Sequence, residues 1–136
     1  MKVEAQIKLA FEGVDILNVN FEAIAPPQED LNIKVELTSA VFYPQENKQI
    51  FKIVTDLKVE DERYFTLSLR GVGNFRLSED LTDDTKKLFV NTNAPAIMFP
   101  YLRAFVSTLT ANLGESFNSI TIPTQFFKGE LEEIKL

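Results

Sequence analysis

Four clusters of carboxylates are the first candidates for chemistry in this sequence. A pair of carboxylates acts as general acid and base when the two face each other across a cleft. Each cluster is equally typical of a turn, a helix start or a solvated face, so we expect no catalysis from them. Calcium binding through Asp80, Asp83 and Asp84 is not expected either, because their spacing misses the loop pattern with glycine at its sixth position. The clusters are Glu29-Asp30, Glu60-Asp61-Glu62, Asp83-Asp84 and Glu132-Glu133.

The sequence contains neither histidine nor cysteine. This excludes disulfides, thiolate zinc sites and cysteine nucleophiles, and it removes both the base of a catalytic triad and the commonest metal ligand. The stretch Gly71-Val72-Gly73 is not a phosphate-binding loop, because it lacks a third glycine and no Lys-Ser/Thr pair follows it. A β-bulge or close backbone packing explains these glycines better. We therefore predict that the protein is not an enzyme and needs no metal or other cofactor.

Acidic residues outnumber basic ones by 20 to 14, and the formal net charge is −6. The longest basic run is the pair Lys86-Lys87. Nucleic acid requires clustered Lys and Arg that displace counterions, so we expect neither nucleic acid nor an anionic membrane as a partner. No apolar run approaches the ~20 residues of a membrane-spanning helix, and residues 1–8 lack the apolar core of a secretory signal. We expect a soluble, cytoplasmic protein without membrane insertion.

A chain of 136 residues that is 45% hydrophobic and 25% charged is typical of one globular domain, so residues 1–136 are predicted to form a single domain. The aromatic composition is less ordinary, with 12 Phe and no Trp. These phenylalanines either pack in a core or line an apolar groove for extended peptide, where Phe and Met adapt to varied side chains. Both interpretations stay open at this point. The phenylalanines in the last 40 residues are Phe99, Phe105, Phe117, Phe126 and Phe127.

The first ~75 residues alternate apolar and polar side chains with the period of a sheet that has one buried face. The alternation slips near Glu12-Gly13, which indicates a bulge or bend in the first strand. The connections are short, and short connections favour antiparallel neighbours. The four predicted strands span residues 3–23, 31–43, 49–59 and 64–75.

After Phe75 the apolar period changes to that of helices, so strands come first and helices follow, as in α+β proteins. Ser78-Glu79-Asp80 places a capping side chain and two acids ahead of the first helix. Pro100 lies inside the second helix and either kinks it or marks its true start. Pro123-Thr124 opens a short last helix. The predicted helices span residues 78–90, 93–113 and 123–134.

Residues 93–103 read N-A-P-A-I-M-F-P-Y-L-R. This stretch resembles the signature of the SecB family, the bacterial protein-export chaperones, in which a Pro, apolar residues, Phe-Pro-Tyr and an Arg open the main helix. Residues 19–23 are similar to the end of the first SecB strand, and residues 71–75 to the Gly-Gly-Ile-Phe that closes the fourth. Residues 123–127 resemble the entry to its last helix. The resemblance covers roughly residues 16 to 133, in the same order.

The resemblance implies a four-stranded antiparallel sheet followed by helices packed on one face, assembled as a homotetramer, a dimer of dimers. It implies a holdase that binds unfolded or nascent polypeptides without ATP and passes preproteins to the export motor SecA. Client grooves of this family lie between the sheet and the helical layer and are lined by apolar residues. The corresponding candidates for client binding are Phe75, Met98, Tyr101, Phe105, Phe126 and Phe127.

The motor-binding surface of SecB is acidic and lies at the end of strand one and on strand four. Glu22 matches one of its acids, whereas Asn18 and Ser68 stand where we expect others, so weak or absent SecA binding is predicted. An alternative is a SecB-like chaperone dedicated to the antitoxin of a toxin–antitoxin system. A third hypothesis is an α+β domain, enzymatic or not, with an apolar pocket for a small molecule; the lack of His and Cys argues against it.

Overall fold

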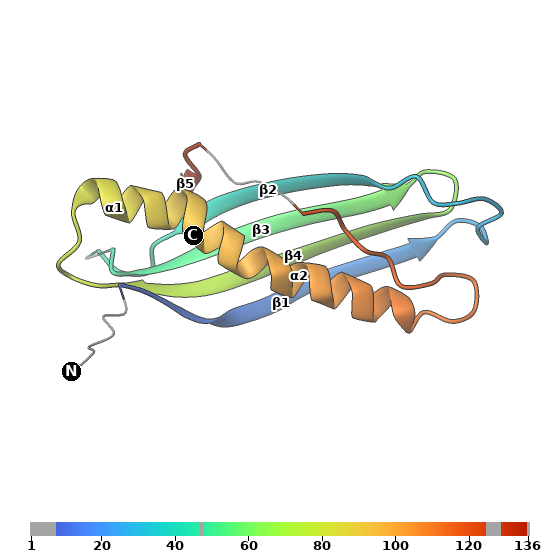
Figure 1. Cartoon of the computed structure of the whole chain (residues 1–136), viewed down its shortest axis with the longest axis horizontal. Coiled ribbons are helices and arrows are strands. Elements are labelled where there is room, and N and C mark those ends of the chain that lie inside the picture. Colours follow the sequence, from blue (N-terminus) through green and yellow to red (C-terminus); the bar gives the residue numbers. More distant parts are fainter. Residues whose placement is uncertain (1–7, 47, 125–128, 136) are drawn as a thin grey trace, which may run out of the picture.

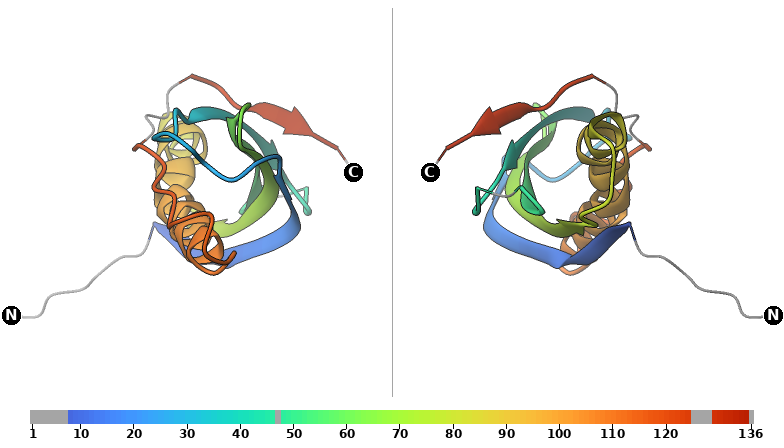
Figure 2. Two further views of the ribbon diagram at one scale, coloured as in Figure 1. Left: turned by 90° about the vertical axis from the view of Figure 1, so that its right-hand side faces the viewer. Right: turned by 90° about the vertical axis from the view of Figure 1, so that its left-hand side faces the viewer.

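The computed structural model describes residues 8–46, 48–124 and 129–135 (Figure 1). Within these residues, four long antiparallel strands form a sheet in the order β1-β4-β3-β2, and a short β5 runs parallel to β2 at its edge. Seen end-on, the helical stretch lies on one side of the sheet (Figure 2). This architecture confirms the predicted α+β fold. The strands are Leu9–Ala23 (β1), Lys34–Phe42 (β2), Ile50–Asp61 (β3), Phe65–Leu77 (β4) and Glu132–Ile134 (β5), and the helices are Asp83–Leu88 (α1), the π-helix Phe89–Asn93 (η1) and Ala94–Ala111 (α2).

Strand β1 is irregular where the sequence predicted it. Its pairing with β4 shifts register between Phe11 and Val14, and again between Ile16 and Asn18. Gly13 lies at the first shift with a φ of 115°, a conformation that favours glycine because it has no Cβ. Strand β2, in contrast, pairs with β3 at every position from 34 to 42 without a shift. The pairing at one edge of the sheet, β1 with β4, is therefore irregular, and that of β2 with β3 is regular.

The core lies between the sheet and α2 and is built by the period-two alternation of β3 and β4. Gly71 and Gly73 allow α2 to come close to β4, since a Cβ on Gly71 would lie 2.5 Å from Leu102 Cδ2 and one on Gly73 would lie 2.9 Å from Met98 Sδ. Close backbone packing therefore accounts for the Gly-Val-Gly stretch. The buried residues include Phe51, Ile53, Leu57, Val59, Phe65, Leu67, Leu69, Phe75, Met98, Leu102 and Val106.

The first helix begins later than predicted. The backbone N–H of Ser78 still donates to Lys8 O at 2.9 Å, so the chain continues to run beside the sheet at the position where a cap was expected. Thr82 caps the helix instead, accepting from Thr85 N at 3.3 Å. The helix then continues through η1 into α2 without a break. Pro95 supplies no N–H for the carbonyl four residues earlier, and the wider turn just before it is consistent with that loss.

Two further details differ from the sequence prediction. Pro100 lies inside α2, which begins at Ala94, so it does not mark the start of the helix. Where the last helix was expected, residues 132–134 form β5, with Glu133 in register with Val41. Its helical spacing was a local signal, and pairing with the free edge of β2 prevailed over it. Residues 123–124 and 129–131 of that predicted helix are not helical, and residues 125–128, including Phe126 and Phe127, lie outside the described residues.

Candidate functional site

A groove of about 300 Å³ with both polar and apolar side chains lies between the β1–β2 connection, residues 24–33, and residues 116–121 after α2. Phe117 is buried beneath it, with its ring 5.5 Å from that of Phe21 and 5.8 Å from that of Phe65, both in edge-to-face geometry. Leu31 and Ile33 are half-buried on the opposite side. The lining residues are Pro27, Glu29, Asp30, Leu31, Ile33, Ser116, Phe117, Asn118, Ser119, Ile120 and Thr121.

The first wall of the groove is clamped by the hairpin turn between β3 and β4. The carboxylate of Asp61 is only 4% exposed; Oδ2 accepts from the backbone N–H of Asn32 at 2.8 Å and from Arg63 Nη2 at 2.8 Å. Arg63 also bonds Glu29 at 2.5 Å and the carbonyl of Asp30 at 3.2 Å. These hydrogen bonds, that from Arg63 first and that from Asn32 next, hold the pKa of Asp61 well below its ordinary value. The loop is therefore fixed at the end that enters β2.

The second wall is fastened to the end of α2 by hydroxyl groups. Thr110 Oγ1 accepts from the backbone N–H of Ile120 at 2.7 Å, and Ser107 Oγ donates to the carbonyl of Ile120 at 3.1 Å. Ser119 Oγ donates to Ser107 O at 2.9 Å. Both backbone groups of Ile120 are thus satisfied although its side chain is buried. The groove is preformed between two anchored segments.

The residues predicted to bind clients do not gather in this groove. Phe75 and Met98 are buried in the core, where the Phe75 ring stacks on Phe51 at 5.3 Å. Tyr101 is 54% exposed beside Phe11, with ring centroids 4.9 Å apart, and Phe105 is half-buried. The other two candidates, Phe126 and Phe127, are outside the described residues.

Sequence reasoning missed the residues that do line the groove. Phe117 was visible as one of the C-terminal phenylalanines but was not included among the candidates. Leu31 and Ile33 were read only as the start of a strand. Two features of the sequence pointed to these residues. Leu31 and Ile33 follow a loop that contains Pro26-Pro27, and Phe117 belongs to the surplus of phenylalanines near the C-terminus.

Large apolar side chains are also exposed on β1 and on α2, the helix that crosses it (Figure 1). Leu17 is 65% exposed, as a large apolar side chain on a strand that ends the sheet. Large apolar side chains that are left exposed at a sheet edge are typical of contact surfaces. The exposed side chains on these two elements are Leu17, Val19, Ile97 and Tyr101.

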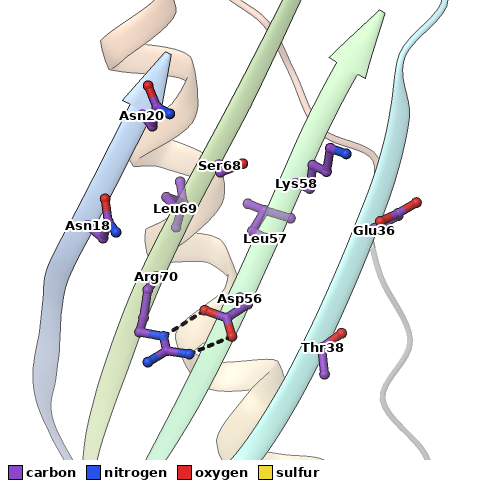
Figure 3. A pocket seen from close by; sticks show the side chains of 10 residues that line it. All are labelled: Asn18, Asn20, Glu36, Thr38, Asp56, Leu57, Lys58, Ser68, Leu69 and Arg70. Atoms are coloured by element: carbon purple, nitrogen blue, oxygen red, sulfur yellow. Dashed lines mark hydrogen bonds and ion pairs between the residues drawn. The ribbon is translucent and has the colours of Figure 1, made fainter. Parts of the chain in front are cut away.

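The predicted partner residues lie on the face of the sheet that points away from α2. Asn18 and Ser68 line the same polar hollow of about 480 Å³ (Figure 3). Glu22 is exposed on the same strand as Asn18, and the alternation along β1 places it on the same face.

Charges in this hollow balance. Arg70 binds Asp56 through two hydrogen bonds of 2.7 and 2.9 Å (Figure 3), and the bond from Arg70 lowers the pKa of Asp56. Glu36 and Lys58 add one further charge of each sign. The hollow is therefore polar without being acidic.

The sequence pattern of the family described as preprotein translocase subunit SecB matches residues 5–128. The chain belongs to the SecB family. Proteins of the SecB family are chaperones rather than enzymes, so the prediction of a non-enzymatic chaperone is confirmed at this level.

Similar proteins come from bacteria and from an archaeon. A SecB protein-export protein of Orientia tsutsugamushi (strain Boryong) is 25% identical over 108 residues, which are 78% of this chain and 65% of that protein. One from Idiomarina loihiensis is 25% identical over 117 residues, 78% of this chain and 68% of that protein. An uncharacterised protein of Methanocaldococcus jannaschii is 25% identical over 119 residues, 82% of this chain and 76% of that protein. The chain thus spans about two thirds of the length of the SecB relatives.

A SecB-like chaperone of Mycobacterium tuberculosis, solved with a peptide from the HigA1 antitoxin, has the same fold. The TM-score is 0.67 at 16% sequence identity, with 86% of this chain and 91% of that chain covered. Within the described part of the SecB-family chain, no helix has the length and apolarity that a membrane crossing requires.

Proposed function

We propose that this protein is an ATP-independent holdase that binds unfolded polypeptides and keeps them from aggregating, with preproteins for Sec-dependent export as its clients. The observation that supports this is the groove between residues 24–33 and 116–121, where the half-buried Leu31 and Ile33 lie among polar side chains and whose two walls are anchored by hydrogen bonds. Membership of the SecB family supports the same function.

Such a groove binds an unfolded chain by removing apolar side chains from water. The gain is roughly 25 cal/mol per Å² of apolar surface buried, from which the ordering of the client must be subtracted. Anchored walls reduce the ordering cost on the chaperone's side. No nucleotide takes part in binding of this kind, so the client leaves when it folds or when a partner takes it over.

The test is an aggregation assay with a chemically denatured client protein, with and without ATP. The unmodified protein should suppress aggregation equally in both. Leu31→Ser should weaken suppression several-fold because it removes apolar area from the groove. The matched control is Leu88→Ser, which changes an exposed leucine at the end of α1 and should have no effect. Melting curves of both variants separate loss of the groove from unfolding, and no suppression by unmodified protein in stoichiometric excess would contradict the holdase.

Tyr101 and Phe105 remain proposed client contacts, because neither side chain is fully buried. Phe75 and Met98, in contrast, are proposed to act through the stability of the core, since they are covered in this structure. An alanine scan should separate the two pairs: Phe75→Ala should cost about 3–5 kcal/mol of stability, whereas Tyr101→Ala should weaken client binding with little change in stability.

A second candidate function is that of a chaperone dedicated to one antitoxin. The similarity to the mycobacterial SecB-like chaperone, which was solved with an antitoxin peptide, favours it. The two functions differ in client range. A dedicated chaperone would protect one antitoxin encoded beside it, together with a toxin, whereas a holdase for export would suppress aggregation of unrelated denatured proteins.

A further inference from the structure

One edge of the sheet is only partly covered. Strand β2 has nine residues, of which β5 pairs with the last three, so residues 34–39 remain. Among the described residues, the backbone hydrogen bonds outside regular elements include none from residues 34–39. In an antiparallel pair, every second residue points its N–H and C=O away from its partner strand. The outward donors and acceptors of this part of β2, beside the groove, thus have no backbone partner among the described residues.

The open edge lacks the features by which proteins prevent strand pairing. Bulges and prolines commonly protect edges. Strand β1 has two register shifts, but β2 pairs evenly with β3, and residues 34–39 contain no proline. The only protective feature in this stretch is its charged outer face, with Lys34 and Glu36.

The chain itself provides an example of strand addition at this edge. Residues 132–134 lie parallel to residues 40–42. Among the described residues, the segment is also held by a bond from Leu131 N to Asn91 Oδ1 at 2.8 Å, by packing of the Leu131 side chain against the core, and by an ion pair of 3.6 Å between Lys48 and Glu133. An extended segment thus docks on this edge by pairing its backbone with β2.

The free part of the edge is continuous with the groove. Ile33 lines the groove and directly precedes β2. Val35 and Leu37 follow on the same face, half-buried against the core, while Lys34 and Glu36 point to the other face. An extended segment along this edge would alternate its side chains between the two faces, so every second one would extend the apolar contact that begins in the groove.

We propose that residues 34–39 of β2 form a strand-addition site for an extended segment of the client polypeptide. The segment pairs with β2 through its backbone and places alternate apolar side chains beside Val35 and Leu37. This inference deepens the proposed function and rests on it. Main-chain pairing supplies affinity that does not depend on sequence, which suits a chaperone with many clients.

The test uses a fluorescently labelled twelve-residue peptide in which Leu or Val alternates with Ser. It is made unmodified, with N-methyl groups on the serine amides, and with N-methyl groups on the apolar amides. Only one of the two sets of amides faces β2 in an added strand. One methylated form should therefore bind at least ~10-fold more weakly, since several main-chain bonds are lost, while the other stays within about 2-fold of the unmodified peptide.

Hydrogen exchange provides a second measurement on the unmodified protein. Amides within residues 34–39 that exchange rapidly should become protected when the unmodified peptide is added. Equal binding of the two methylated forms, strong or weak, would overturn strand addition and leave the groove as the site. Strand addition would also be overturned if the protein held a denatured client but did not bind the unmodified peptide. The same holds if a second copy of this chain already protected these amides before any peptide was added. Failure to hold a denatured client at all would instead overturn the proposed function.

Discussion

Asp61 is the carboxylate whose environment departs most from what its neighbours in sequence would suggest. In the sequence, Glu60, Asp61 and Glu62 are three equivalent acids of a predicted turn. In the structure, only Asp61 of the three is buried. Its two oxygens accept from the backbone N–H groups of Asn32 and Arg63 and from the Arg63 side chain. It therefore acts as a structural clamp, and the alternation of β3 brings it inward.

We predict that this clamp makes stability depend on acid pH. The pKa of Asp61 is lowered in the folded protein from ~3.9 in the unfolded chain, so its contribution is fully present above pH ~4 and is lost as the pH falls from there through the lowered value. Asp61→Asn should lower the melting temperature at neutral pH, and the deficit should shrink below pH ~4. Asp56→Asn is the control on the same strand, where a half-exposed ion pair should matter less. A deficit for Asp61→Asn that is the same at every pH would contradict the clamp.

Gly71 is the second residue whose role the structure defines. An added Cβ would press on Leu102, which is buried and closely packed. We predict that Gly71→Ala destabilises the protein by about 1–3 kcal/mol through overpacking. Ser68→Ala, on the exposed face of the same strand, should change stability little. Urea denaturation of both variants measures this, and equal midpoints would show that α2 shifts freely.

Among the elements, those with a local signal were predictable. Buried and less buried residues alternate along the whole of β3 and along β4 except at residues 71–73, and the glycines of β1 and β4 mark a bulge and a close approach. The groove was not predictable from spacing, because Ile33 and Phe117 are distant in sequence and meet only through clamps on the β3–β4 turn and on α2. Strand β5 was missed for the same reason, since its partner is an edge that only the folded sheet creates.

The prediction on SecA concerns the face of the sheet that points away from α2. Charge steering needs an excess of one sign, and the hollow at Asn18 and Ser68 is balanced. We predict weak or absent SecA binding, with client holding intact. Asn18→Asp with Ser68→Glu should strengthen binding several-fold and make it more salt-sensitive. The gain is limited because the register partners of these positions are Arg70 and Lys58.

The measurement is a SecA titration of both forms at low and high salt. A neutral double variant, Asn18→Ser with Ser68→Thr, controls for the loss of the native side chains. Tight, salt-sensitive binding by the unmodified protein would mean that the contact surface lies elsewhere, and it would favour the export function over the antitoxin alternative.

At the scale of the whole molecule, the exposed apolar side chains of Leu17 and Val19 on the edge strand β1 favour contact with another subunit. We propose a homotetramer built as two dimers, through this strand. Light scattering at micromolar concentration should report about four chains of 15.5 kDa. Leu17→Asp should yield smaller species, whereas Leu88→Asp, at another exposed leucine, on α1, should not. A monomer for the unmodified protein would refute the assembly.

The short β5 also sets a length. Beyond its pairing with residues 40–42, no described strand covers the outer edge of residues 34–39 of β2, which is roughly 20 Å of strand at ~3.3 Å per residue. The segments that nucleate amyloid in unfolded chains are about six or seven residues long. Under the strand-addition proposal, one such segment just fills the free edge, and β5 stops it from extending further. A client segment paired with β2 would still expose its own outer edge to other unfolded chains. Binding must therefore be brief, or the groove must turn the client chain away from β2. The client would then be protected one short stretch at a time.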